Sequence, residues 1–282
     1  MNGIEPMDNG WPARLALGFE RRDERTVLAH AEHAGPLRVQ RAFHPEGPAC
    51  PHVYLLHPPG GLVPGDALDI DLALAAGSRA LITTPASGKV YGVGERRLPQ
   101  RQTVSARVDD GATLEWLPQD TIVFDGADAT LESRFDLGAD ARLVAWEIVT
   151  LGRAAGAAPF LRGRVRQRFN VTQHGAPLID ERIDIRGGSP MLDARWGLGG
   201  NRVFGTLVAT GTVDAAGMAA LRALGEARDD AFWSCTTLPG LVLARYLGCD
   251  AREALALMQS AWSLLRPVLL GSEAVPPRVW AT

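Results

Sequence analysis

The sequence has few cysteines and no long apolar run, and both absences limit what the chain can be. It contains three cysteines, Cys50, Cys235 and Cys249, an odd number without a CxxC pair. A disulfide framework is therefore not expected, and a reducing compartment fits. No apolar stretch approaches the roughly 20 residues that span a bilayer. Residues 1–6 lack the basic patch and apolar run of a secretory signal, so we expect a cytoplasmic protein.

A surplus of charge of one sign is also lacking. Lysine and arginine number 29 against 32 aspartate and glutamate residues, which gives a net charge of −3. Nucleic-acid binding normally needs a clustered cationic surplus, so nucleic acid is not an expected partner. One basic run, Arg162, Arg164, Arg166 and Arg168, alternates strictly and places all four on one strand face. A solvated strand face is favoured there over a phosphate or acidic-partner site.

The motifs of common enzymes are missing as well. Gly88-Lys89 is not a phosphate loop, because Thr83 stands where the earlier glycine is required. There is no Gly-x-Ser-x-Gly elbow, and the histidines lack an orienting aspartate nearby in the sequence. We therefore expect no catalytic residue. A β-helix-type hydrolase with a dispersed active site remains the alternative, because convergence in space is not visible in sequence spacing.

Short apolar stretches, separated by Gly, Pro and Asp, fill residues 10–210 and predict consecutive β-strands. Residues 68–74 alternate strictly, with apolar side chains on one face and Asp69 and Asp71 on the other, as in a half-buried strand. The tight-turn residues between strands fit an antiparallel meander or a β-helix-like stack. The predicted class is mainly β, with antiparallel or mixed strands. Further strands are expected at 79–84, 101–108, 113–117, 130–137, 142–151, 164–172 and 178–186.

Two helices are expected in the last quarter of the chain. Asp214 can cap a run that ends near Ala223, and Asp250 can cap residues 251–266, which Pro267 would end. The second helix carries one apolar stripe that includes Trp262. Packing of this stripe against the sheet is favoured over a groove ligand for a partner. We expect one domain over residues 1–282, strand-rich over 10–210 and helix-containing over 211–282.

Thiolate and imidazole donors lie close together in one short segment. Cys50 and His52 flank a proline, and His57 follows five residues later. Nickel and zinc both accept such donors. The alternative is that Cys50 and His52 belong to a strand, one in the core and the other satisfied by a backbone carbonyl. No second cluster completes a four-ligand site, so the structural interpretation is favoured and the three residues stay metal candidates.

A series of ordered segments carries a recognisable pattern. They are GPLRVQR at 35–41, Cys50, YLLHPPGGLV at 54–63, GD at 65–66, LEWLPQD at 114–120, FDGA at 124–127, LGR at 151–153, LRP at 265–267 and PRVWAT at 277–282. Together they resemble the UreD (also UreH) family of urease accessory proteins, from about residue 10 to the C-terminus. Each segment alone is weak, but their number and order are specific.

The resemblance implies an assembly factor without catalysis of its own. UreD proteins bind apo-urease together with a helical partner, UreF, and a GTPase, UreG, and the complex promotes carbamylation and nickel loading. The implied fold is a β-helix-like stack with a few helices. No tightly bound cofactor is expected, and nickel would bind only transiently, because a protein that passes an ion on should hold it weakly. We place the expected partner interface at Trp262, Arg266, Arg278 and Trp280.

The resemblance also implies a polar interior path through Asp66, Glu147 and Glu181. Carboxylates beside trapped water can lower the barrier for a divalent cation. Each residue has an alternative role: Asp66 as a turn residue beside Gly65, and the two glutamates in ion pairs with neighbouring arginines. The arginines in question are Arg142 or Arg153 for Glu147, and Arg164 or Arg182 for Glu181.

Overall fold

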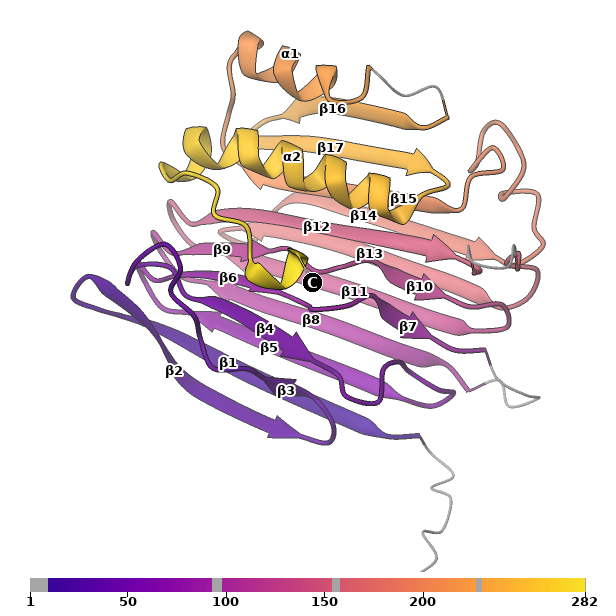
Figure 1. The fold of residues 1–282 in the computed structure, drawn as a ribbon, viewed down its shortest axis with the longest axis horizontal. Helices are drawn as coiled ribbons and strands as arrows, with labels where there is room; N and C mark the ends of the chain where they lie inside the picture. Colours follow the sequence, from indigo (N-terminus) through magenta and orange to yellow (C-terminus); the bar gives the residue numbers. More distant parts are fainter. Residues whose placement is uncertain (1–9, 93–97, 154–157, 227–229, 282) are drawn as a thin grey trace, which may run out of the picture.

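The computed structural model describes residues 10–92, 98–153, 158–226 and 230–281, so the N-terminal segment 1–6 lies outside the described residues. Two facing sheets and a layer of helices make up the molecule (Figure 1). The first sheet has seven strands in the order β14-β13-β11-β8-β5-β1-β2. Its strands are β1 (Pro12–Arg22), β2 (Arg25–Ala34), β5 (Ala67–Leu74), β8 (Gln100–Val108), β11 (Asp128–Leu137), β13 (Arg164–Gln173) and β14 (Ala176–Arg186).

The second sheet has ten strands, and its main path runs β16-β17-β15-β12-β9-β6-β4-β3. β10 pairs with β12 and with β7 beside this path. Its strands are β3 (Arg38–Val39), β4 (His52–Leu56), β6 (Arg79–Thr83), β7 (Gly88–Val90), β9 (Thr113–Trp116), β10 (Thr121–Val123), β12 (Arg142–Leu151), β15 (Val203–Thr210), β16 (Phe232–Leu238) and β17 (Leu241–Gly248). The prediction of a mainly β chain with mixed strands is thus confirmed.

The chain alternates between the two sheets over its central part. β5, β8, β11 and β13 pair in parallel in the first sheet, while β4, β6, β9 and β12 do so in the second. The turns at 75–78, 109–112 and 138–141 therefore join strands of opposite sheets, where the sequence suggested antiparallel neighbours. The β-helix-like description is not confirmed, because the strands form two facing sheets.

Both predicted helices are present, and their N-terminal caps are as expected. The carboxylate of Asp214 accepts the N–H of Gly217 at the start of α1 (Ala215–Ala223), and Asp250 accepts that of Arg252 at the start of α2 (Ala251–Leu270). α2 does not end at Pro267 as predicted but continues to Leu270. A proline in the last turn removes only one helical hydrogen bond, and Gly271, with φ 64°, provides the left-handed ending.

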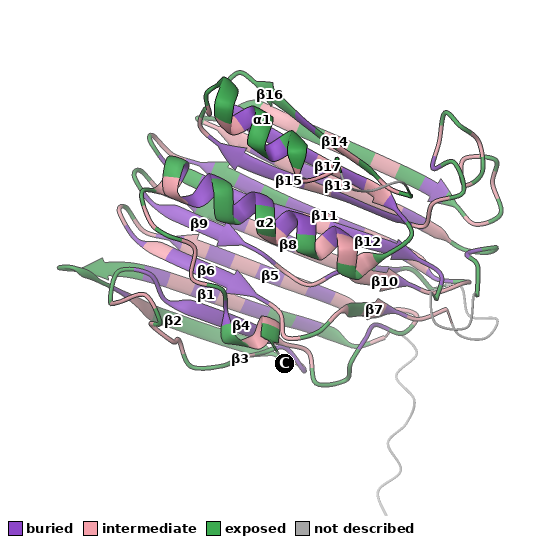
Figure 2. Ribbon diagram, turned by 45° about the horizontal axis from the view of Figure 1, so that its top comes forward, coloured by how far each residue is buried: buried purple, intermediate pink, exposed green. Residues whose placement is uncertain are grey.

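α2 lies across β12, β15 and β17, on the side of the second sheet that faces away from the first (Figure 1). Of its predicted stripe, Met258, Trp262 and Leu265 are buried there, while Leu255 is half-buried and Leu257 is buried beside them. The second sheet is therefore covered on both faces along these strands (Figure 2). Burial on both faces explains why β12 reads as a nearly continuous apolar run. Neither described helix has the length and apolar character to cross a membrane.

Candidate functional site

Polar side chains interrupt the apolar layer between the two sheets. On the second sheet, Glu147 of β12 is paired in register with Thr206 of β15, which is paired with Arg245 of β17. The neighbours of Glu147 on the same face of β12, Ala145 and Val149, belong to the core between the sheets. An acidic residue at an inward position of an otherwise apolar strand is the local signal of this arrangement.

The first sheet supplies the partners. Ser133 of β11 donates a hydrogen bond to Glu147, and Nε2 of Gln167 on β13 donates to Glu147 Oε2 at 2.7 Å. Nearer the sheet edge, Arg245 Nη2 lies 3.3 Å from Oε2 of Glu181 on β14. The Thr206 hydroxyl donates to Glu181 Oε1 at 3.3 Å. We call this set the inter-sheet polar row: Ser133, Glu147, Gln167, Glu181, Thr206 and Arg245.

The two carboxylates of the row lie in different electrostatic settings. Burial raises the pKa of Glu147, and the charge of Glu181 raises it further, while the hydrogen bonds from Ser133 and Gln167 act in the opposite direction. Among the described residues, the side chains that donate hydrogen bonds to Glu147 are neutral, whereas Glu181 forms an ion pair with the guanidinium of Arg245. Glu147 is therefore the carboxylate that gains most from a proton or a cation.

Two hollows occur near these strands, and the polar row lines one of them. One is a cavity of about 320 Å³ lined in part by His57, Lys89, Gln102 and Trp116. Trp116 is paired with Ala145, two residues before Glu147, and its buried Nε1 has no hydrogen-bond partner in the described part of the chain. The other hollow, about 340 Å³, contains Glu181, Thr206 and Arg245 in its own wall, together with Leu198 and Phe232.

Asp66 lies apart from the row. Its carboxylate accepts hydrogen bonds from the backbone N–H of Trp11 at 2.8 Å and from that of Val63 at 2.9 Å. Such side-chain to backbone hydrogen bonds are typical of an aspartate in a turn. Its charge partly offsets the burial that lowers the pKa of His57. Of the three expected path residues, the structure brings Glu147 and Glu181 together and leaves Asp66 at the end of the sheet.

The expected ion pairs of the two glutamates differ from the observed ones. Glu181 pairs with Arg245, 64 positions along the chain, and Glu147 is held by Ser133 and Gln167. The sequence reasoning missed these partners because strand pairing between distant segments brings them together. The only available signal was their inward position on apolar strands.

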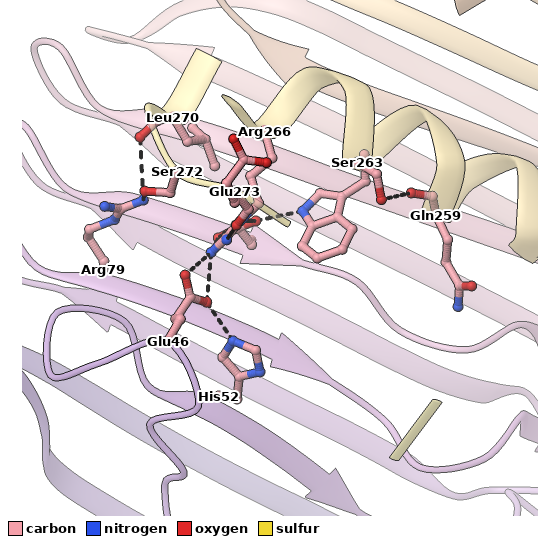
Figure 3. A network of polar contacts seen from close by, with 11 residues as sticks. Glu46, His52, Arg79, Gln259, Ser263, Arg266, Leu270, Ser272 and Glu273 are labelled. Atoms are coloured by element: carbon pink, nitrogen blue, oxygen red, sulfur yellow. Dashed lines mark hydrogen bonds and ion pairs between the residues drawn. The ribbon is translucent and has the colours of Figure 1, made fainter. Parts of the chain in front are cut away.

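A second polar cluster lies on the other face of the second sheet (Figure 3). The guanidinium of Arg266 on α2 binds Glu115 of β9 through Nε at 2.9 Å and Glu46 through Nη2 at 2.7 Å. Trp262 Nε1 donates to Glu115 at 2.6 Å, and His52 Nε2 lies 2.6 Å from Glu46. We call these five residues the Arg266 network.

The Arg266 network changes the interpretation of the expected partner interface. Trp262 and Arg266 are completely buried, so in this structure neither presents a surface to a partner. Trp280 is half-buried, and its Nε1 donates to Thr83 Oγ1 at 3.0 Å. Arg278 is exposed and remains a candidate for partner contact. The spacing of apolar residues along the helix could not show that Arg266 is interior. Its burial depends on Glu46 and Glu115, which come from distant segments of the chain.

The metal candidates are also rearranged. Glu46, Cys50 and His52 place their donor atoms within 4.8 Å of one another, whereas His57 lies in the wall of the 320 Å³ cavity. Burial raises the pKa of the Cys50 thiol, and the charges of Glu115 and Glu46 add to this effect. Burial also acts to raise the pKa of Glu46, but hydrogen bonds from His52 and Arg266 bring it below its usual range.

Comparison with known proteins decides the family. A family model described as "UreD urease accessory protein" matches residues 12–281. The chain belongs to the UreD family. The urease accessory protein UreD of Hahella chejuensis is 42% identical, over 96% of this chain and 91% of the relative. Those of Pseudoalteromonas translucida and Pseudomonas fluorescens are 44% and 43% identical, each over 96% of this chain and over 91% and 95% of the relative.

These comparisons confirm the resemblance noted in the sequence. The similarity extends through both sheets and α2, so it covers the strands that carry the polar row and the Arg266 network. The relatives are named as accessory proteins, which suggests a role without catalysis.

The raised pKa of Glu147 leads to a prediction about pH and stability. A carboxyl whose folded pKa is raised stabilises the fold below the unfolded pKa of about 4.3 and loses that contribution as pH rises through the folded value. Glu147→Gln keeps a neutral side chain at every pH. Its Tm minus that of the unchanged chain should therefore increase between pH 4.5 and pH 8. Glu132→Gln, on the solvent side of β11, is the control and should show no such trend.

Proposed function

We propose that this chain is a non-catalytic scaffold of urease maturation, acting in the cytoplasm. It would bind apo-urease together with UreF-like and UreG-like partners and help nickel reach the urease active site. The observation that carries the proposal is the carboxylate-containing polar row between the sheets, in a chain that matches the UreD family over residues 12–281. The names of the relatives favour this role over the hydrolase alternative.

The polar row supports passage of a divalent cation in two ways. Hydrated nickel accepts oxygen ligands, and Glu147 and Glu181 are carboxylates that sense each other's charge within the same layer. Among the described residues, the hydrogen-bond donors to Glu147 are neutral, so a cation beside it would relieve an unfavourable buried charge. The hollow whose wall contains Glu181, Thr206 and Arg245 provides space for water. Nickel is here the cargo, held briefly by oxygen ligands.

One end of the sandwich supports docking of partner proteins. It is the end at which β1, β5, β8, β11 and β13 begin and β17 ends (right-hand side of Figure 1). Among the described residues, nine large hydrophobic side chains are exposed, and six of them belong to segments at this end. We call this set the apolar end: Trp11, Val63, Leu98, Leu161, Trp196 and Phe232.

Two features of the apolar end fit a protein partner. Exposed apolar patches mark interaction sites, and tryptophan is enriched among residues that dominate binding energy. Both hollows also draw wall residues from loops at this end, for example Pro58 for the first and Met191 for the second. A partner seated here would lie beside both hollows.

The accessory role is tested in cells that carry a urease operon with and without this gene. We expect the deletion strain to produce urease that is inactive and poor in nickel, and complementation to restore both properties. Urease activity and the nickel content of the purified enzyme are the two measurements. Fully active urease in the deletion strain would contradict the proposal and favour the hydrolase alternative.

Glu181→Ala tests the path itself. The side chain is partly exposed on the edge strand β14, so its loss should cost about 0.5 kcal/mol of stability and leave the partner complex intact. We expect the nickel content of urease to fall severalfold, because one of the two carboxylates of the row is gone. Asp180→Ala, on the opposite face of the same strand, should leave nickel content unchanged. Equal nickel in the two variants would remove Glu181 from the path.

Trp196→Asp tests the apolar end. Trp196 is 75% exposed, so the substitution should leave the Tm of the isolated chain unchanged. We expect the affinity for the co-purifying accessory partners or apo-urease to fall at least tenfold, which corresponds to about 1.4 kcal/mol. Val268→Asp, at an apolar position on α2 that is 64% exposed, should bind as before. Binding that survives Trp196→Asp but not Val268→Asp would move the docking surface to the helix layer.

A further inference from the structure

We infer that Arg245 is the counter-ion that a divalent cation displaces from Glu181, and that it sets how loosely the inter-sheet polar row holds its cargo. Arg245 would do so within the passage of nickel proposed above, on which its role depends. Of the six residues of the row, Arg245 alone carries a positive charge. It is a positioning residue, because it acts on the ion through Glu181 and not by direct contact.

Strand pairing places Arg245 beside both carboxylates of the row. On the second sheet, Glu147, Thr206 and Arg245 follow one another across β12, β15 and β17. From the first sheet, Glu181 of β14 reaches across to Thr206 and Arg245. The charge of Glu181 raises the pKa of Glu147, so the two carboxylates lie within electrostatic reach of each other. A cation that binds Glu181 therefore also favours the ionised form of Glu147.

The ion pair between Arg245 and Glu181 is a loose one. The guanidinium faces both carboxylate oxygens, but Nε lies 3.4 Å from Oε1 and Nη2 lies 3.3 Å from Oε2. Charge-assisted hydrogen bonds between nitrogen and oxygen are usually about 2.7–2.9 Å long. The exposed pair of Arg101 and Asp69 in the first sheet also makes two contacts, at 2.7 and 3.0 Å. Arg245 thus recognises the carboxylate without the short contacts that would hold it there.

Arg245 also has access to solvent. Its side chain is 42% exposed, and that of Glu181 is 22% exposed. Both line the hollow of about 340 Å³. Ion pairs with this much access to water contribute little stability, so the guanidinium can turn outward while the carboxylate stays. Arg266 is the contrast within the same molecule, because it is completely buried and bound to two carboxylates.

The charges of the row explain why a dication would displace Arg245. With both glutamates ionised, the two carboxylates and the guanidinium leave the row with a single negative charge. A dication that arrived while Arg245 stayed would leave one positive charge in excess between the sheets, where unbalanced charge is costly. If Arg245 turns to solvent, the dication and the two carboxylates balance. The return of Arg245 then competes with the ion for Glu181 and promotes its release.

The test is a calorimetric titration of the full-length chain with Ni²⁺ alone, in a buffer that does not bind metals. We expect Arg245→Gln to bind Ni²⁺ about tenfold more tightly than the unchanged chain, because a neighbouring positive charge weakens a cation site by a factor of this order. Arg245→Lys keeps the charge and should stay within about threefold of the unchanged chain. In the double variant Glu181→Ala, Arg245→Gln the gain should disappear, since the carboxylate that Arg245 masks is absent.

Arg182→Gln is the matched control. Arg182 follows Glu181 on β14, is exposed on the opposite face of the strand and pairs with Asp180. Its substitution removes the same charge from the chain, so a general effect of net charge would tighten Ni²⁺ binding in both variants. We expect the Ni²⁺ affinity of Arg182→Gln to equal that of the unchanged chain. A purely structural role of Arg245 would instead lower the Tm of Arg245→Gln without a gain in Ni²⁺ affinity.

Equal or weaker Ni²⁺ binding by Arg245→Gln would overturn the inference. So would a gain that persists without Glu181 or that appears equally in Arg182→Gln. If Arg245→Gln fails to fold, Arg245→Met, which keeps a long side chain without its charge, gives the same comparison. The outcome is distinguishable from that of the nickel path. Urease that keeps its nickel with Glu181→Ala contradicts the path, whereas unchanged Ni²⁺ affinity of Arg245→Gln contradicts the role of Arg245 alone.

Discussion

The second sheet is covered on both faces, by the first sheet on one side and by α2 on the other, and this constraint governs the rest of the molecule. A polar side chain on these central strands has little access to bulk water, so a partner within the protein stabilises it. Glu147 and Glu115 lie on adjacent strands, β12 and β9, and point to opposite faces. The inter-sheet polar row supplies the hydrogen-bond partners of Glu147, and the Arg266 network supplies those of Glu115.

The two carboxylates are satisfied in different ways. Glu115 is held by the guanidinium of Arg266 and by the indole of Trp262, which ties α2 to the sheet. A buried pair of this kind adds little net stability, but removal of one member is costly, so it fixes which side chains meet. Among the residues that the structure describes, a hydroxyl and an amide donate to Glu147, and burial raises its pKa. The carboxylate of Glu115 is thus neutralised by an ion pair within the fold, whereas that of Glu147 would gain from a proton or a cation.

The layers also separate three sets of residues in space. The polar row lies between the sheets, the Glu46, Cys50 and His52 donors lie on the helix side, and the apolar end presents exposed tryptophans at one edge. The row and the donor cluster are thus on opposite faces of one sheet.

The sequence by itself determined the strand-rich class, the capped starts of both helices and, through its ordered segments, the family. Alternation over 68–74 and the caps at Asp214 and Asp250 are local signals, and the structure has each of them. The tertiary structure alone decided that the turns cross between sheets, that Glu181 meets Arg245, and that Trp262 and Arg266 are interior. It also decided that Glu46, and not His57, completes the donor cluster. The reason is physical: alternation assigns a side chain to a face, but only non-local strand pairing decides what lies opposite that face.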